Sequence, residues 1–316
     1  MKPLLQLVAA DEGFAADLHR ALRQQPRAIS PKYFYDEIGS ALFERICELP
    51  EYYPTRTELD LLRRHAPEMA AQMGPDAQLV EYGAGALRKV RLLLEHLSEP
   101  HSFVPVDISG PHLMAACHTL KTELPALHVQ PVIADFTRPH DLPTLPAKGR
   151  RIGFFPGSSI GNFAPEQALD FLRMAARQLR GGALLIGVDL IKDPALLHAA
   201  YNDAQGVTAA FNLNILDRAC RELGAEIEEQ GFVHSAFYNA PLQRIEMHLQ
   251  STRRQQLRLE HRVYDFAAGE TLHTENSYKY SVEGFQQLAR EAGFRPTTVW
   301  TDERGWFSLH WLAAPD

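Results

Sequence analysis

Two glycines stand in the stretch LVEYGAGALRKV, residues 79–90, where a predicted strand gives way to a predicted helix. Glycine lets a ligand approach the main chain closely, although an ordinary tight turn uses the same residues. Lys89 follows in the first turn of a predicted helix, and Asp107 ends the next predicted strand, 24 residues after Gly83. A carboxylate at the end of that strand suits the two hydroxyls of a ribose.

Two residues at the end of a third predicted strand extend this pattern. Asp135 can accept a hydrogen bond from an adenine amino group while Phe136 packs on the ring. The glycine loop lacks the third glycine of the dinucleotide fingerprint, since Leu87 and Arg88 follow instead. These residues favour an adenosyl ligand without phosphates, such as S-adenosylmethionine. An NAD-dependent enzyme and other α/β domains remain alternatives on this pattern alone.

Alternating strands and helices must position these residues. Short apolar strands are predicted over 78–83, 102–109, 128–136, 151–157 and 183–190, with amphipathic helices between them. This alternation predicts a parallel sheet covered on both faces, which binds ligands at the carboxyl ends of its strands.

The pattern changes after residue 190, where a helical stretch over 193–223 is broken near Gly206 and several strand-like segments follow. A final helix and two strands return to the first pattern. We therefore expect a doubly wound, Rossmann-like α/β sheet with an inserted second α+β domain. The predicted boundaries are 57–190 plus 279–316 for a cofactor-binding domain and 1–56 plus 191–278 for a substrate-binding domain.

Composition excludes several classes of function. The net charge of -7, without a basic stretch interleaved with aromatics, argues against nucleic-acid binding. Three scattered cysteines without a CxxC pair indicate a reducing compartment and no zinc site. No metal is expected, because the histidines show no ligand spacing along the chain; those considered are His101, His118, His234, His248 and His273.

The first apolar run is seven residues long, too short to span a membrane, and no signal-peptide cleavage pattern is convincing. We expect a cytoplasmic protein with no membrane partner. A monomer is expected too, because no apolar helical stripe is left over for a partner.

Long motifs of this sequence resemble the histidine Nα-methyltransferases of ergothioneine biosynthesis. They occur in matching order from about residue 28 onward: PKYFYDEIGSALFERICELPEYYPTRTE (31–58), FFPGSSIGNF (154–163), DLIKDPALLHAAYNDAQGVTAAFNLN (189–214), RIEMHL (244–249) and HTENSYKYS (273–281). That family transfers three methyl groups from S-adenosylmethionine to the α-amine of L-histidine and forms the betaine hercynine. The resemblance implies a class I methyltransferase sheet. The expected reaction is direct in-line displacement, which requires no metal.

The resemblance implies a set of cofactor contacts that matches the positions chosen from spacing. They are Gly83, Lys89, Asp107, Asp135 and Phe136. One departure is that EYGAGALRKV replaces the usual E-L-G-S-G-T-x-x-K-T, so Ala84 lacks a hydroxyl. We expect a change in cofactor affinity but not in cofactor identity.

The resemblance also implies how the substrate carboxylate is held, by Tyr52, Asn162 and Tyr201. Neutral donors are chemically sensible there, because an arginine would add charge beside an amine that must be unprotonated and a cationic sulfonium. Tyr35 would lie near the amine, where its hydroxyl orients the lone pair, and Phe211 would line the same region.

The imidazole contacts implied by the resemblance come from two further segments. Glu275 would accept an imidazole N–H, Ser277 would hold the other side of the ring, and Asn276 between them would contribute backbone contacts. Met247 would pack against the ring. Glu275 together with Met247 favours histidine. The alternatives are methylation of another amino acid or of an imidazole nitrogen, as in ovothiol synthases, and a methyltransferase-like module that binds without turnover.

Overall fold

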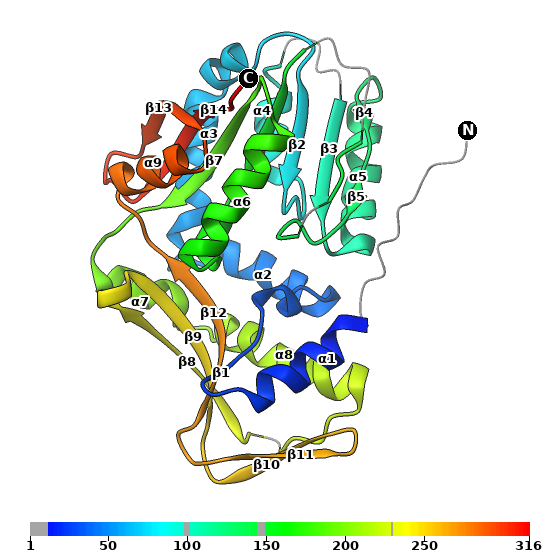
Figure 1. Ribbon diagram of the computed structural model, residues 1–316, viewed down its shortest axis with the longest axis vertical. Coiled ribbons are helices and arrows are strands. Elements are labelled where there is room, and N and C mark those ends of the chain that lie inside the picture. The colour runs from blue at the N-terminus through cyan, green and yellow to red at the C-terminus, as the bar shows by residue number, and fades with distance from the viewer. Residues whose placement is uncertain (1–11, 98–101, 139, 144–148, 229) are drawn as a thin grey trace. The chain divides into compact units, whose positions relative to one another are not determined.

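The computed structural model describes residues 12–97, 102–138, 140–143, 149–228 and 230–316, and these form two compact units (Figure 1). Within the described ranges, the first unit comprises residues 54–192 and 278–316, and the second comprises residues 12–53 and 193–277. The chain therefore leaves the first unit after residue 192 and returns to it at residue 278.

A mainly parallel sheet forms the centre of the first unit. Its strand order is β13-β14-β7-β6-β2-β3-β4, and β5 pairs with β3. The strands are β2 (Gln78–Tyr82), β3 (Ser102–Asp107), β4 (His128–Val129), β5 (Val132–Ile133), β6 (Arg151–Phe155), β7 (Ala183–Asp189), β13 (Arg295–Thr301) and β14 (Phe307–Ala313). β14 pairs antiparallel with both of its neighbours, β7 and β13. The pairs among β2, β3, β4, β5, β6 and β7 are parallel. This confirms the predicted doubly wound sheet, whose strand order reverses between β2 and β6, the place at which open α/β sheets generally bind ligands.

Helices cover both faces of this sheet because alternate strand residues point to opposite sides. On β2, Leu79 belongs to the core under α3 (Tyr53–Met73), α4 (Arg88–Leu94) and α5 (Gly110–Glu123). The next residue, Val80, belongs to the core under α6 (Pro165–Gln178) and α9 (Val282–Glu291). Figure 1 shows α6 lying across the near face.

One predicted strand differs from the observed structure. The stretch 128–136 was expected to be continuous, but it is divided into β4 and β5. Pro131 lies in the interruption and has no N–H to donate to a ladder. The chain still reaches the carboxyl edge of the sheet with Asp135 and Phe136 after β5.

The second unit is built on a four-stranded sheet of order β1-β12-β9-β8 and a separate β10-β11 hairpin. Its strands are β1 (Arg27–Ala28), β8 (Phe232–Asn239), β9 (Arg244–Ser251), β10 (Gln255–Leu259), β11 (Arg262–Phe266) and β12 (Thr271–Tyr278). Its helices are α1 (Glu12–Arg23), α2 (Glu37–Glu48), α7 (Pro194–Tyr201) and α8 (Val207–Leu223), with short 3-10 turns at Pro31–Phe34 and Ala240–Leu242. The predicted break near Gly206 is confirmed, since that residue has φ +70 and precedes α8.

The two faces of this sheet differ in what they carry. Nδ1 of His234 on β8 lies 2.9 Å from Nδ2 of Asn212 on α8, so the side chain of His234 faces this helix. In the strand pairing, His234 lies opposite Leu249 of β9. The face with Leu249 and the equally buried Met247 therefore lies under α8. Glu246 and His248, which alternate with these residues, point to the opposite face.

Candidate functional site

The glycine loop of the first unit adopts a conformation that requires glycine. Gly83 and Gly85 have φ values of +69 and +51, in the left-handed region that residues with a Cβ rarely adopt. A Cβ on Gly83 would lie 3.3 Å from the ring of Phe136. The structure thus brings Gly83 and Phe136 together, two of the residues predicted to contact the cofactor.

Asp107 joins the end of β3 to this loop. Its Oδ2 accepts the N–H of Gly85 at 2.9 Å, and its Oδ1 accepts the N–H of Ser109 at 2.8 Å. Burial raises the pKa of the Asp107 carboxyl, while the hydrogen bonds from Ser109 and Gly85 act to lower it. The carboxylate is therefore held at the carboxyl end of β3 by backbone groups that leave further lone pairs for a ligand.

Asp135 has a local structural role as well as its predicted one. Its Oδ1 accepts the N–H of Thr137 at 3.0 Å, and Nε of Arg138 lies 3.6 Å from Oδ2. These contacts shape the turn that presents Phe136. Adenine recognition by Asp135 stays a prediction.

A buried carboxylate that sequence reasoning missed holds Lys89. Glu58 of α3 is fully buried, and its Oε2 lies 2.6 Å from Nζ of Lys89. Both carboxylate oxygens of Glu58 also accept the N–H of Gly157, at 2.9 Å. Gly157 follows β6 in the segment that leads to Asn162, the last residue of the 3-10 turn Ser159–Asn162. Glu58 therefore links two segments that carry predicted site residues.

A second missed carboxylate lies on β2 itself. Glu81 is 1% exposed, and its Oε2 has no hydrogen-bond partner among the described residues. Burial raises its pKa well above the ordinary value; Lys89 opposes this shift, and Asp107 and Glu58 add to it. A buried carboxylate oxygen without a partner is costly unless a ligand supplies a donor. The sequence signal was a glutamate two residues before Gly83 in an otherwise apolar strand.

These groups fit S-adenosylmethionine chemically. The ligand carries an ammonium and a sulfonium, which suit the carboxylate of Glu81, and a carboxylate, which suits the ammonium of Lys89. Gly83 has no side chain, and the ring of Phe136 lies close beside its backbone. Asp107 supplies charged acceptors for hydroxyl groups.

The second unit assembles residues from four segments that are distant in the sequence. Oη of Tyr201, at the end of α7, donates to Oγ of Ser277 on β12 at 2.8 Å, and both residues are buried. The ring of Tyr52 lies edge-on to that of Tyr201, with centroids 6.3 Å apart. Removal from water raises the pKa of Tyr52 well above its usual value, and Tyr201, Cys47, Glu275 and Tyr35 add to this shift in that order.

Aromatic rings surround this group. Phe211 of α8 contacts Tyr35 with ring centroids 5.8 Å apart. Phe43 of α2, which was not predicted, lies between Tyr35 at 5.7 Å and Tyr52 at 6.4 Å. Their edge-to-face contacts hold the tyrosine rings in fixed orientations.

The predicted imidazole contacts lie on β9 and β12. Met247 is 2% exposed, and its carbonyl oxygen lies 3.0 Å from Oγ1 of Thr274, which is 2.7 Å from Oδ1 of Asn212. This network ties both strands to α8. Oδ1 of Asn276 is buried without a hydrogen-bond partner in the part of the chain that the structure describes, so it offers an acceptor that the sequence did not predict.

The two units thus hold different parts of the predicted set. Asn162 and the predicted cofactor contacts belong to the first unit, and the other predicted substrate contacts belong to the second. The joint contact of Asn162, Tyr52 and Tyr201 with one carboxylate stays a prediction. In the described residues no helix is both long and apolar enough to cross a membrane.

Comparison with known proteins identifies the family to which the chain is related. Residues 14–314 match a family described as histidine-specific methyltransferase, SAM-dependent. The chain is 41% identical to the histidine N-alpha-methyltransferase of Mycolicibacterium smegmatis, over 97% of each chain. It is 40% identical to the histidine N-alpha-methyltransferase of Mycobacterium tuberculosis, over 93% of this chain and 92% of that one.

A solved structure with a similar fold is that of a possible exported protein from Bordetella parapertussis. The TM-score is 0.52 and the sequence identity 13%, over 96% of this chain and 95% of that one. This likeness concerns the fold alone.

Proposed function

The chain belongs to the family of histidine-specific, S-adenosylmethionine-dependent methyltransferases, and we propose that it trimethylates the α-amine of L-histidine to hercynine. Membership of this family, together with the strand order of the sheet, confirms the predicted class I methyltransferase fold. The observation that carries the substrate assignment is the group formed by Tyr201 and Ser277, with Tyr52 and Glu275 as electrostatic neighbours.

In this proposal the first unit binds the cofactor and the second binds most of the substrate. Lys89 pairs with the cofactor carboxylate, Glu81 with its ammonium, and Asp107 with the ribose hydroxyls, while Asp135 and Phe136 hold the adenine. When bound, S-adenosylmethionine supplies an electrophilic methyl group on a sulfonium. Glu58 supports the site by holding Lys89 at 2.6 Å.

The second unit recognises histidine by pairing its polar groups. Glu275 accepts one imidazole N–H, Ser277 holds the opposite side of the ring, and Met247 packs on it. An amino acid that leaves Glu275 or Ser277 unpaired is rejected strongly, because a buried polar group without a partner costs about 1–3 kcal/mol. Tyr52 and Asn162 donate to the carboxylate, and Tyr201 does so when its hydroxyl turns from Ser277 to the substrate.

The reaction needs an unprotonated amine rather than a strong base. The unperturbed pKa of an α-amine is about 8, so a useful fraction is neutral near pH 7. Tyr35 orients the lone pair, and its ring, with Phe211 beside it, stabilises the growing ammonium charge by about 0.5–2 kcal/mol. Fixing the amine for displacement in line with the leaving sulfur supplies most of the acceleration.

The remaining assignments concern the partners and the location of the chain. The net charge of -7 disfavours nucleic acid, and we propose a cytoplasmic monomer without a membrane partner. Light scattering coupled to size-exclusion chromatography tests the oligomeric state. A mass of two chains would overturn the monomer.

The proposed function is tested by incubating the purified protein with free histidine and S-adenosylmethionine and determining the mass of the product by mass spectrometry. We expect histidine carrying three additional methyl groups, and we expect Nα,Nα-dimethylhistidine to serve as a substrate. Histidine already methylated on the α-amine three times is the matched control and should remain unchanged. Its conversion would point to the imidazole nitrogen, and the absence of any product would point to a module that only binds.

A further inference from the structure

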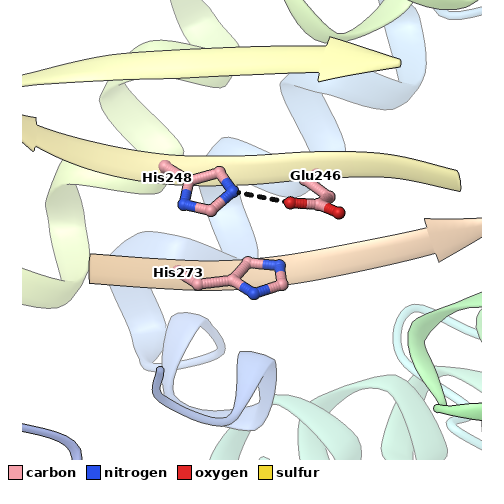
Figure 2. A group of neighbouring side chains, drawn as sticks. All are labelled: Glu246, His248 and His273. Atoms are coloured by element: carbon pink, nitrogen blue, oxygen red, sulfur yellow. Dashed lines mark hydrogen bonds and ion pairs between the residues drawn. The ribbon is translucent and has the colours of Figure 1, made fainter. Parts of the chain in front are cut away.

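Three potential metal ligands lie together on the face of the second unit's sheet opposite Met247. Glu246 and His248 lie two residues apart on β9, and His273 lies on the neighbouring β12 (Figure 2). One ligand atom from each residue lies within 4.8 Å of the others. Spacing along the sequence did not reveal this group, because 25 residues separate His248 from His273 and only strand pairing unites them.

The carboxylate of Glu246 is already oriented by its neighbours. Its Oε1 accepts hydrogen bonds from Arg244, with Nε at 2.8 Å and Nη2 at 2.7 Å, and from Nδ2 of Asn239 at 2.8 Å. Its Oε2 lies 3.0 Å from Nε2 of His248. Hydrogen bonds of this kind to a ligating carboxylate are typical of metal sites, where outer groups fix the ligands.

The two histidine rings are oriented as well. Nε2 of His273 donates to the carbonyl oxygen of Glu275 at 3.0 Å, so its Nδ1 carries a lone pair. The ring of His248 is stacked between Phe237, at 5.4 Å, and His273, at 4.4 Å. Metal-bound histidines commonly donate their second ring nitrogen to a backbone carbonyl in the way that His273 does.

One atom of the group lacks a partner. Nδ1 of His248 is buried and makes no hydrogen bond within the described residues. The rings of His248 and His273 are only 14° from parallel, so they must turn for their lone pairs to converge on one ion. Phe237 is 43% exposed, which leaves a route from solvent on this face.

We propose that Glu246, His248 and His273 bind a divalent transition-metal ion of the zinc type. Two imidazole nitrogens and one carboxylate are a donor set that Zn²⁺ accepts, and three protein ligands leave one coordination position open. Arg244 remains paired with Oε1 of Glu246, and its positive charge lowers the affinity of the site for a cation. The proposed methyl transfer does not use this ion.

The location connects the site to histidine binding, a connection that rests on the proposed function. The ion would lie one residue from Met247 along β9 and two residues from Glu275 along β12. It would therefore fix the two strands that carry the proposed imidazole contacts. Metal binding itself can be tested without any turnover, so its failure and the failure of the proposed function are distinguishable.

Titration of the untagged, chelator-treated full chain with Zn²⁺ in a calorimeter tests the site. We expect one saturable equivalent, and His248→Ala and His273→Ala should each weaken binding by about tenfold or more. His118→Ala and His128→Ala, which change exposed histidines elsewhere, are the matched controls and should bind as the unaltered chain does. Equal losses in the controls, or no saturable binding, would overturn the proposal.

Substitution with Co²⁺ provides a readout on the unaltered chain, in case a variant fails to fold. Nitrogen and oxygen ligands give visible d–d bands without the thiolate charge-transfer band that a cysteine site would show. Those d–d bands should disappear in Glu246→Gln, which retains a side chain of similar size. A thiolate band in the unaltered chain would assign the ion to cysteine and contradict the site.

Discussion

The two units place their chemical groups in different ways. In the first unit the backbone positions most of the predicted site residues, because parallel strands end at one edge and bring the glycine loop, Asp107 and Phe136 together. In the second unit, side chains from separate segments meet through hydrogen bonds and ring contacts, as Tyr201 and Ser277 do across 76 residues. We therefore expect a site built on strand ends to keep its cofactor despite a change such as Ala84, although with altered affinity, whereas a site built on side-chain pairing should depend on each member.

The largest expected effect is a loss of stability at Glu58. In the first unit, where the backbone positions most groups, this buried side chain has a supporting role. Glu58→Gln removes the charge that lies 2.6 Å from Lys89. We expect the free energy of unfolding to fall by about 3 kcal/mol, since breaking a buried ion pair leaves a poorly compensated charge. Denaturant titration measures it.

The control for that variant is Glu303→Gln, which alters an ion pair with Arg64 whose glutamate is 85% exposed. A surface pair contributes at most about 1 kcal/mol. If the two variants lose the same free energy, the pairing of Glu58 is not a supporting element of the cofactor half.

The second effect tests side-chain dependence in the second unit. Glu275→Ala should raise the KM for histidine by roughly 30- to 150-fold, because a charged hydrogen bond contributes about 2–3 kcal/mol. The affinity for S-adenosylmethionine should not change. Steady-state kinetics with calorimetry of cofactor binding separates the two. An unchanged KM would remove Glu275 from imidazole recognition.

Asp107 provides the corresponding test in the first unit. Asp107→Ala should weaken cofactor binding by about 1.5–3 kcal/mol if the carboxylate holds both ribose hydroxyls. Because Asp107 also accepts N–H groups of Gly85 and Ser109, thermal unfolding must be measured in parallel. Cofactor affinity equal to that of the unaltered protein, measured calorimetrically on folded protein, would show that the ribose lies elsewhere.

The smallest effect concerns buried histidines. Burial lowers the pKa of His310 on β14 to about 4, so the folded protein keeps it neutral while the unfolded chain takes up a proton near pH 6.5. The stability it contributes is complete above that pH and is lost as the pH falls toward 4. His310→Gln should therefore reduce the slope of unfolding free energy against pH in this window by about 1 kcal/mol per pH unit.

His234 in the second unit is the comparison for that slope. Burial lowers its pKa too, but its hydrogen bond to the carbonyl of Tyr201 opposes the shift. His234→Gln should change the slope less than His310→Gln does, in urea titrations at several pH values. A larger change in His234→Gln would contradict the assignment of the acid sensitivity to the first unit.

Much of the first unit could be predicted from the sequence, because strand alternation and glycine spacing are local signals. The interruption of β4 and β5 at Pro131 was missed, although proline gives a local signal for it. Glu58 was missed because nothing near it in the sequence marks a helical glutamate as the partner of Lys89. Such a pairing depends on tertiary packing.

The second unit was less predictable from its residues alone. Tyr52, Tyr201 and Glu275 have ordinary core or surface interpretations when taken singly, and only resemblance to a family indicated that they act together. Strand pairing likewise made neighbours of His248 and His273, which no spacing rule had linked.

Methylation of the α-amine can be tested by NMR of the product formed from histidine and S-adenosylmethionine labelled with ¹³C in its methyl group. We expect the transferred methyl groups to be equivalent and to correlate through the nitrogen with the α-carbon of histidine. Correlation with imidazole ring carbons instead would contradict it.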